Sequence, residues 1–186
     1  MADLKSLYLA AVRALTGNPA ALIRWEAPLA GAGEVQKVEG APLISVASGL
    51  DEEGRLRVVL HECGHWVCQG GGQGLAETDG RPSVKGRPHD LSWLVGEAMA
   101  DIQKWHWLIE AEKRWLRYAW RCEGYTACLL RALVDMGTSE TLPEDQLIEF
   151  TAKLWKSYTE AMGIKEEAEQ WLEKSRKQRV IAGPGC

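Results

Sequence analysis

The sequence predicts an α+β fold in which helices dominate and a small antiparallel sheet packs against one of them. Residues 3–16 repeat apolar side chains at the three- and four-residue spacing of an amphipathic helix. Two short segments around Gly40, residues 34–39 and 42–48, carry the valine, leucine and isoleucine that are typical of strands. Residues 91–122 contain no proline, as a long helix requires.

The N-terminal helix should end at residues 16–19, because Gly17 and Pro19 both interrupt a helix. Proline is also favoured at a first helical position, so we expect Pro19 to open a short second helix that runs through Trp25. The two strands around Gly40 follow and form the sheet.

The central helix is expected over residues 52–69, with Asp51 or Ser48 as its N-cap. Residues 70–72 are three glycines and end it. Residues 69–89 then form a long loop rich in glycine, which is either a mobile lid over a site or a passive linker.

The rest of the chain reads as helices. Asp90 is the expected cap of a helix over residues 91–122, which Gly124 ends. We therefore expect a main domain at residues 1–122 and a C-terminal helical extension, residues 123–186, packed on it. The extension's expected parts are a helix at 125–136, a helix from Pro143 to Met162 with Thr141 as its cap, a helix at 165–179 and a frayed tail at 182–186.

The central helix carries the segment His61-Glu62-Cys63-Gly64-His65. Two histidines four residues apart share one helix face, so both imidazoles can bind one zinc ion. Glu62 follows His61 directly, so its side chain points beside the metal and does not bind it. From there its carboxylate can take a proton from a metal-bound water. The sequence therefore predicts a metal site with Glu62 as general base.

A third ligand is expected from the next helix. Glu97 and Asp101 are also four residues apart, on one face. Glu97 can complete a His-His-Glu site with His61 and His65. Asp101 can accept the free ring N–H of His61, which fixes its tautomer. The alternative is that these are ordinary surface residues and that His65 is a hydrogen-bonded core histidine.

The combination of His61, Glu62 and His65 with Glu97 and Asp101 resembles the gluzincin type of zinc metallopeptidase. Over residues 40–110 the chain is similar to the small ImmA/IrrE-type metallopeptidases, from which it differs by Cys63 and by the long loop. The resemblance implies a zincin-like fold, a Zn²⁺ cofactor and a substrate peptide added as a strand at the edge of the sheet. It also implies a regulatory protein partner.

Two assignments remain open in the sequence. Gluzincins usually stabilise the oxyanion with a nearby His or Tyr, and the candidates here are His89, which we favour, His106, Tyr118 and Tyr125. Cys68 lies on the stripe of His61 and His65 and is an alternative soft ligand in place of Glu97.

Composition narrows the function classes. The net charge of −4 gives no electrostatic case for direct nucleic-acid binding. No apolar run reaches the length of a membrane span, and five cysteines without paired spacing indicate a reduced, cytoplasmic protein. The expected partner is thus a peptide or protein substrate, without a membrane.

Three functions compete on the sequence alone. The first is a zinc-dependent metallopeptidase. The second is a catalytically inactive, zinc-stabilised binding or regulatory protein. The third is a metal-free helical module in which the tryptophan-rich helices bind a partner.

Overall fold

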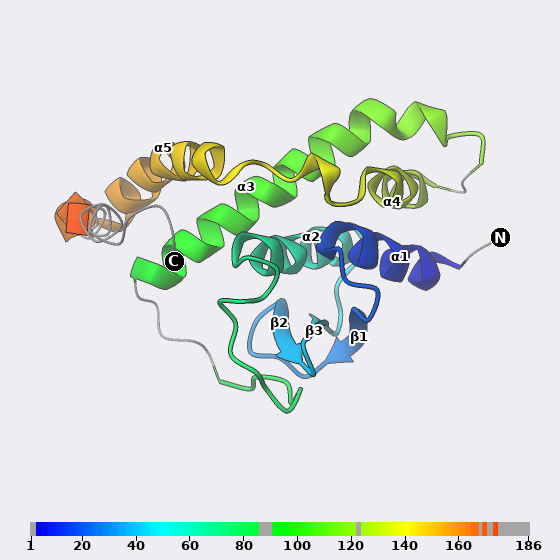
Figure 1. Cartoon of the computed structure of the whole chain (residues 1–186), viewed down its shortest axis with the longest axis horizontal. Coiled ribbons are helices and arrows are strands. Elements are labelled where there is room, and N and C mark those ends of the chain that lie inside the picture. Colours follow the sequence, from blue (N-terminus) through cyan, green and yellow to red (C-terminus); the bar gives the residue numbers. More distant parts are fainter. Residues whose placement is uncertain (1–2, 86–90, 122–123, 168, 171–172, 175–186) are drawn as a thin grey trace.

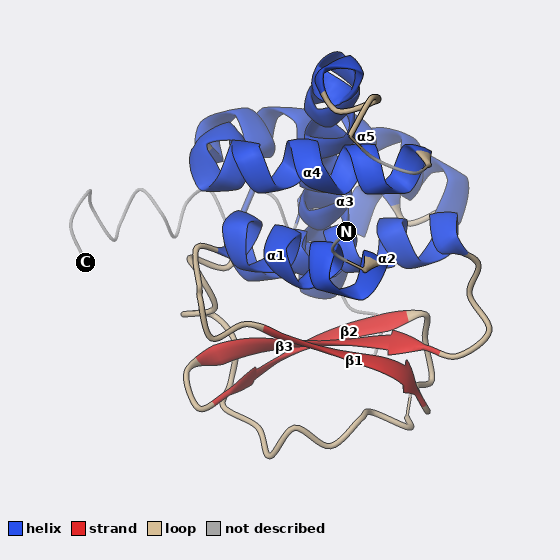
Figure 2. Ribbon diagram, turned by 90° about the vertical axis from the view of Figure 1, so that its right-hand side faces the viewer, coloured by secondary structure: helices blue, strands red, loops and turns tan. Residues whose placement is uncertain are grey.

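The computed structural model describes residues 3–85, 91–121, 124–167, 169–170 and 173–174. Helices dominate it, and a three-stranded mixed sheet accompanies them, which confirms the helix-dominated α+β class. The helices form one layer and the sheet the other, with α1 and α2 next to the sheet (Figures 1 and 2). The main elements in chain order are α1 (Leu4–Thr16), β1 (Leu22–Ala27), β2 (Gly33–Val38), β3 (Ala41–Ala47), α2 (Glu52–Cys68), α3 (Leu91–Arg114), α4 (Tyr125–Met136) and α5 (Glu144–Met162).

The sheet is only partly antiparallel. Its strand order is β1-β3-β2; β2 pairs antiparallel with β3, as predicted, but β1 pairs parallel with β3. The hairpin between β2 and β3 turns through Glu39 and Gly40, both of which have positive φ. Sequence patterns do not record which strands pair, so the parallel partner was missed.

The expected helix from Pro19 to Trp25 is wrong, because residues 22–27 form β1. The side chain of Asn18 accepts a hydrogen bond from the backbone of Ala20 at 2.9 Å, and the Asn18 carbonyl accepts one from Ala21. This local turn replaces the first turn of a helix. The residues that follow form β1 and pair with β3 instead.

Helix α2 begins and ends close to the predicted bounds. Its N-cap is Asp51 rather than Ser48, and the Asp51 side chain accepts a 2.8 Å hydrogen bond from the backbone of Gly54. The loop that follows crosses the face of the sheet opposite the helices (Figure 2). There Arg24 donates to the carbonyl of Gly80 and Gln36 donates to that of Arg81. This part of the loop is thus a cover for the sheet.

Helix α3 ends at Arg114, earlier than predicted, and a 3₁₀ turn, Trp115–Arg117, follows it. The turn directs Tyr118 inward, where its hydroxyl bonds to Asp135 of α4. Helix α5 begins after Pro143, so Thr141 is not its cap. Residues 165–167, 169–170 and 173–174 are helical, whereas Asp90, residues 175–179 and the tail 182–186 lie outside the described residues.

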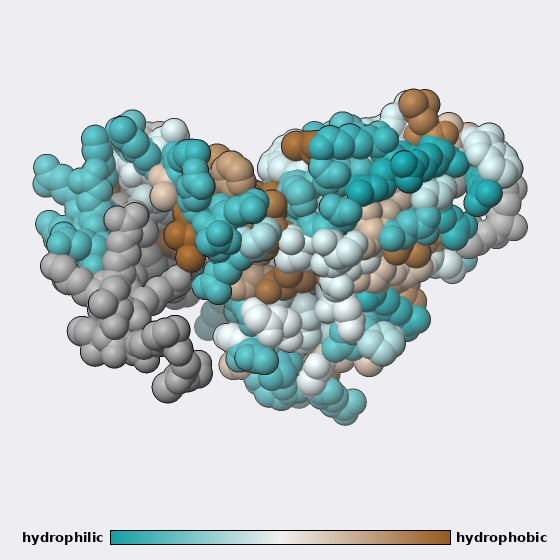
Figure 3. Space-filling view, turned by 45° about the horizontal axis from the view of Figure 1, so that its top comes forward, coloured by the Kyte–Doolittle hydropathy of each residue, from teal (hydrophilic) through white to brown (hydrophobic). Residues whose placement is uncertain are grey.

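One apolar core joins α1, the sheet, α2, α3 and α4. Trp66 and Trp107 are buried in it, whereas Trp120 is 74% exposed. The face seen in Figure 3 is mostly hydrophilic, with smaller apolar areas between the polar side chains. Among the described helices, none is both long and apolar enough to cross a membrane.

Candidate metal centre

Helix α2 places both histidines at the edge of the core. One face of the helix packs into the core and carries the buried side chains Leu60, Cys63 and Trp66. The side chains of His61 and His65 are 17% and 12% exposed, and their rings lie edge to face with centroids 4.6 Å apart. The two imidazoles thus share one partly buried side of the helix, as the four-residue spacing requires.

Gly64 lets α3 approach this part of α2. A Cβ atom at Gly64 would lie 2.7 Å from the carbonyl oxygen of Ala100 and 3.0 Å from its Cα. Contacts this short exist only because Gly64 has no side chain and Ala100 a small one. The close approach brings the Glu97 turn of α3 within reach of the histidines.

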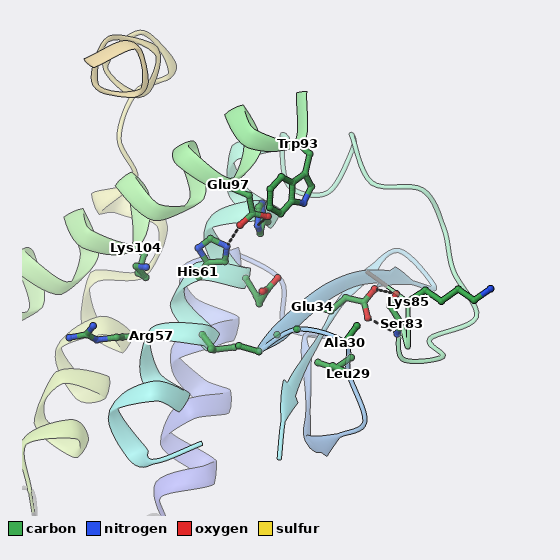
Figure 4. Close-up of a pocket in the computed structure, with 16 residues that line it drawn as sticks. Leu29, Ala30, Glu34, Arg57, His61, Ser83, Lys85, Trp93, Glu97 and Lys104 are labelled. Carbon is green, nitrogen blue, oxygen red and sulfur yellow. Dashed lines mark hydrogen bonds and ion pairs between the residues drawn. The ribbon is translucent and has the colours of Figure 1, made fainter. Parts of the chain in front are cut away.

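The Glu97 carboxylate contacts both imidazoles, and Figure 4 shows its contact with the His61 ring. Its Oε2 is 2.9 Å from His61 Nε2, and its Oε1 is 3.1 Å from His65 Nε2. The three candidate ligand atoms all lie within 4.8 Å of one another. Two ligands of a tetrahedral zinc ion stand about 3.3 Å apart. His61, His65 and Glu97 therefore form a cluster that can hold a metal ion.

Asp101 holds the other side of the His61 ring. Its Oδ1 lies 2.8 Å from His61 Nδ1, and the same oxygen lies 2.5 Å from Lys104 Nζ. An imidazole whose Nδ1–H is donated to a carboxylate presents Nε2 as its free lone pair. Once the ring has lost a proton, this arrangement favours the tautomer of His61 that can bind a metal.

The cluster shifts the pKa of its own members. Burial lowers the pKa of His61, but hydrogen bonds to Asp101 and Glu97 outweigh it and raise that pKa to about 9. Burial raises the pKa of Glu97, and here the bonds from both histidines prevail and lower it to about 2. The pKa of Asp101 is lowered in the same way by His61 and Lys104 against burial. The carboxylates are therefore ionised, as metal ligation requires.

Glu62 lines the same open cleft as the cluster. The cleft has a volume of about 490 Å³ and runs between α2, α3 and residues 29–34, and we call it the metal-site cleft. Glu62 is only 6% exposed, and a Cβ atom at Gly33 would lie 2.9 Å from its Oε1. The carboxylate is thus held between α2 and the start of β2, beside the ligands but outside the cluster.

The other candidates take no part in the cluster. His89 lies outside the described residues. Tyr118 bonds to Asp135 and Tyr125 to Glu112, and neither hydroxyl lines the cleft. His106 is likewise not among the cleft residues. Cys68 is not part of the cluster, and burial raises the pKa of its thiol to about 12, which disfavours the thiolate that a metal needs.

Three polar or aromatic cleft residues on α2 and α3 are not among the candidates that the sequence predicted. Arg57 precedes His61 by one helical turn, Trp93 precedes Glu97 by one turn, and Lys104 follows Glu97 by two. All three lie four or seven residues from His61 or Glu97, so they share a helix face with these residues. The same helical spacing would have predicted them.

No protein-family model, curated protein or solved structure matches this chain. The geometry of the site is therefore the basis for inferring its function.

Proposed function

We propose that this chain is a zinc-dependent metallopeptidase with the gluzincin arrangement of residues, similar to the small ImmA/IrrE-type enzymes. One observation carries the proposal. Three ligand atoms from two helices converge in an open cleft, and the carboxylate next to the first ligand, that of Glu62, lines the same cleft. A cluster that only stabilised the fold would need neither the cleft nor Glu62.

The donor set favours zinc among the divalent metals. Two imidazole nitrogens and one carboxylate oxygen, with a position left open, are typical of catalytic zinc sites. When bound, zinc lowers the pKa of a water toward about 7 and polarises a carbonyl group. His61, His65 and Glu97 would hold the ion, and Asp101 would orient His61.

Glu62 is the proton carrier in this proposal. It follows His61 directly, so it stands beside the cluster, and its burial keeps the carboxylate from being fully solvated. Glu62 accepts the proton of the attacking water and passes it to the leaving amine. Both transfers require a carboxylate at this place, and an amide cannot perform them.

The edge of β2 offers a binding place for an extended peptide. Ala32 and Ala47 are hydrogen bonded across the hairpin, so the backbone groups of Gly33 and Val35 point away from β3. Backbone groups point outward at every second residue of β2, so Lys37 is the next after Val35. The Lys37 carbonyl already accepts a hydrogen bond from the backbone N–H of Thr78. Gly33 lines the metal-site cleft, so a substrate strand added there would pass the metal.

The proposal includes a zincin-like packing of the sheet on α2, a peptide or protein substrate, a regulatory protein partner and a cytoplasmic location. Direct binding of nucleic acid is not part of it, because the net charge is −4.

A zinc-stabilised protein without turnover is the second candidate. Of the described residues that line the cleft, none is a tyrosine, and the only histidines are the two ligands. A hydrogen-bond donor to the oxyanion normally contributes a factor of about a hundred or more to the rate. Without such a donor, the protein would hold zinc but turn over slowly or not at all.

Replacing Glu62 by Gln separates the two candidates. We expect the purified protein to contain one zinc ion and to cleave unfolded protein substrates, and Glu62→Gln to keep the zinc and lose the cleavage. Glu149→Gln, at an exposed carboxylate of α5 that does not line the cleft, is the control and should keep both. Unchanged proteolysis in Glu62→Gln would refute Glu62 as the base. A wild-type protein with bound zinc and no cleavage would favour the second candidate.

A further inference from the structure

A second cavity lies between α3 and α5, with a volume of about 140 Å³. Most of its wall is apolar. The apolar side chains are Trp93, Leu94 and Ala98 from α3 and Leu154 and Trp155 from α5.

This α3–α5 cavity adjoins the metal centre. Glu97, a ligand in the cluster, lines both the cavity and the metal-site cleft, and so does Trp93. Figure 4 shows the Trp93 indole beside the Glu97 carboxylate. A group that enters the cavity therefore lies next to the cluster.

Helix α5 is held firmly enough to form a wall. Thr151, Trp155 and Thr159 recur at four-residue spacing and are 6%, 4% and 2% exposed, so this face packs inward. The Thr159 hydroxyl donates to the carbonyl of Trp155 at 2.8 Å. Its one hydrogen-bond donor is thus used within the helix, and Leu154 and Trp155 make this wall mainly apolar.

The size of the cavity selects its guest. An apolar cavity of about 150 Å³ in a protein binds benzene. The α3–α5 cavity is nearly as large, so it fits a side chain the size of leucine or phenylalanine. The carboxylates of Glu97 and Asp101 also line it and would repel an acidic side chain.

We propose that the α3–α5 cavity is a subsite for an apolar side chain of leucine or phenylalanine size, borne by the substrate residue next to the cleaved bond. This inference rests on the proposed metallopeptidase function. It makes α5, which the sequence assigned to an extension outside residues 1–122, a wall of the substrate site. Leu154, 39% exposed, is then a specificity-determining residue.

Hydroxamic acids with tails of different length test the subsite without requiring turnover. Their head group chelates zinc, and the tail reports on the cavity. Calorimetry on the zinc-loaded full chain should show hexanohydroxamate binding more tightly than acetohydroxamate. Hexanohydroxamate has four methylenes more than acetohydroxamate, and the expected gain is about fourfold for each that enters the cavity, or about 60-fold if three of the four do.

Leu154→Trp should fill the cavity and reduce the gain from the longer tail to less than about threefold. Ile148→Trp is the matched control, because Ile148 is exposed on the same helix and does not line the cavity; it should keep the full gain. Leu154→Ala enlarges the cavity and should shift the best tail to a longer one. Circular dichroism and zinc content verify that each variant is folded.

The outcomes separate the subsite from the metal centre. Equal affinity for both hydroxamates on zinc-loaded protein would overturn the subsite and leave the metal centre standing. A full gain in a folded Leu154→Trp variant would also overturn it, since the tail would then lie elsewhere. A folded protein that binds no zinc would overturn the proposed function and the subsite with it.

Discussion

The contact between helices α1 and α4 and the contact between α2 and α3 have different roles in this protein. Helices α1 and α4 pack against each other, and each carries large aliphatic side chains that are fully buried in the core, among them Leu15 and Leu133. Helices α2 and α3 approach closely at Gly64 and Ala100, where a Cβ atom on Gly64 would meet the backbone of Ala100. The first pair buries apolar area and stabilises the fold. The second brings polar groups from two helices to one place, and small residues at its contact make this possible.

The largest expected effect on zinc binding comes from Glu97→Ala. This change removes the only ligand that α3 supplies, so the zinc affinity should fall by about a thousandfold or more. Competition with a chelator of known affinity measures it. Glu110→Ala removes a carboxylate further along α3 and is the control. Wild-type affinity in Glu97→Ala would mean that Cys68 or another group is the third ligand.

Gly64→Ala tests the close approach itself. The new methyl group meets the backbone of Ala100, which cannot rotate away, so the helices must separate. We expect the zinc affinity to fall between about tenfold and a hundredfold and the free energy of unfolding by about 1–3 kcal/mol.

Gly96→Ala is the matched control for Gly64→Ala, since a Cβ atom at Gly96 meets nothing within 4 Å. It should leave zinc binding unchanged and stabilise α3 slightly. If both variants bind zinc as the wild type does, the distance between α2 and α3 does not control the site.

Asp101→Asn should lower the zinc affinity about tenfold. The amide still occupies the place beside His61 Nδ1 but loses the charge that makes the imidazole a stronger ligand. Titration of the variant with zinc measures the change, with the exposed Asp145→Asn as control. An effect as large as that of Glu97→Ala would instead make Asp101 a direct ligand.

The pH dependence of zinc binding should follow His61. Its pKa of about 9 means that the ring is protonated at pH 7, so zinc must displace about one proton, and affinity rises by somewhat less than tenfold per pH unit up to about pH 9. In the metal-free protein the raised pKa stabilises the fold below the ordinary value of 6.5, and this contribution is lost as the pH rises through about 9. Calorimetry in two buffers of different ionisation enthalpy counts the protons released, and a count of zero would contradict the prediction.

A change in the core next to the α1–α4 contact should have the smallest effect on zinc affinity. Leu133→Ala leaves a cavity in the core and should lower the free energy of unfolding by about 2–5 kcal/mol, while the folded protein binds zinc within about twofold of the wild type. Leu116→Ala, at a side chain that is 70% exposed, should change stability by less than about 0.5 kcal/mol. Denaturant melts measure both. A large loss of zinc affinity in Leu133→Ala would show that the two pairs are coupled.

The sequence was a good guide wherever the decisive interaction was local. The spacing of His61 and His65, and that of Glu97 and Asp101, fixes which side chains share a helix face, and the structure places these residues together. Caps and glycines likewise set the bounds of α2 and α4 closely. The same local reasoning failed at Pro19, because a side chain of the preceding Asn18 formed a turn that competes with a helix.

By itself, then, the sequence determined which residues of each helix share the face that forms the cluster, because the geometry of one helix repeats every 3.6 residues whatever surrounds it. Only the tertiary structure decided that β1 pairs parallel with β3, that the loop after α2 covers the sheet, and that α5 closes a cavity beside Glu97. These features join residues far apart in the chain, and their positions depend on how apolar surfaces fit together in space. The spacing of residues within a single helix or strand does not predict how these surfaces pack together.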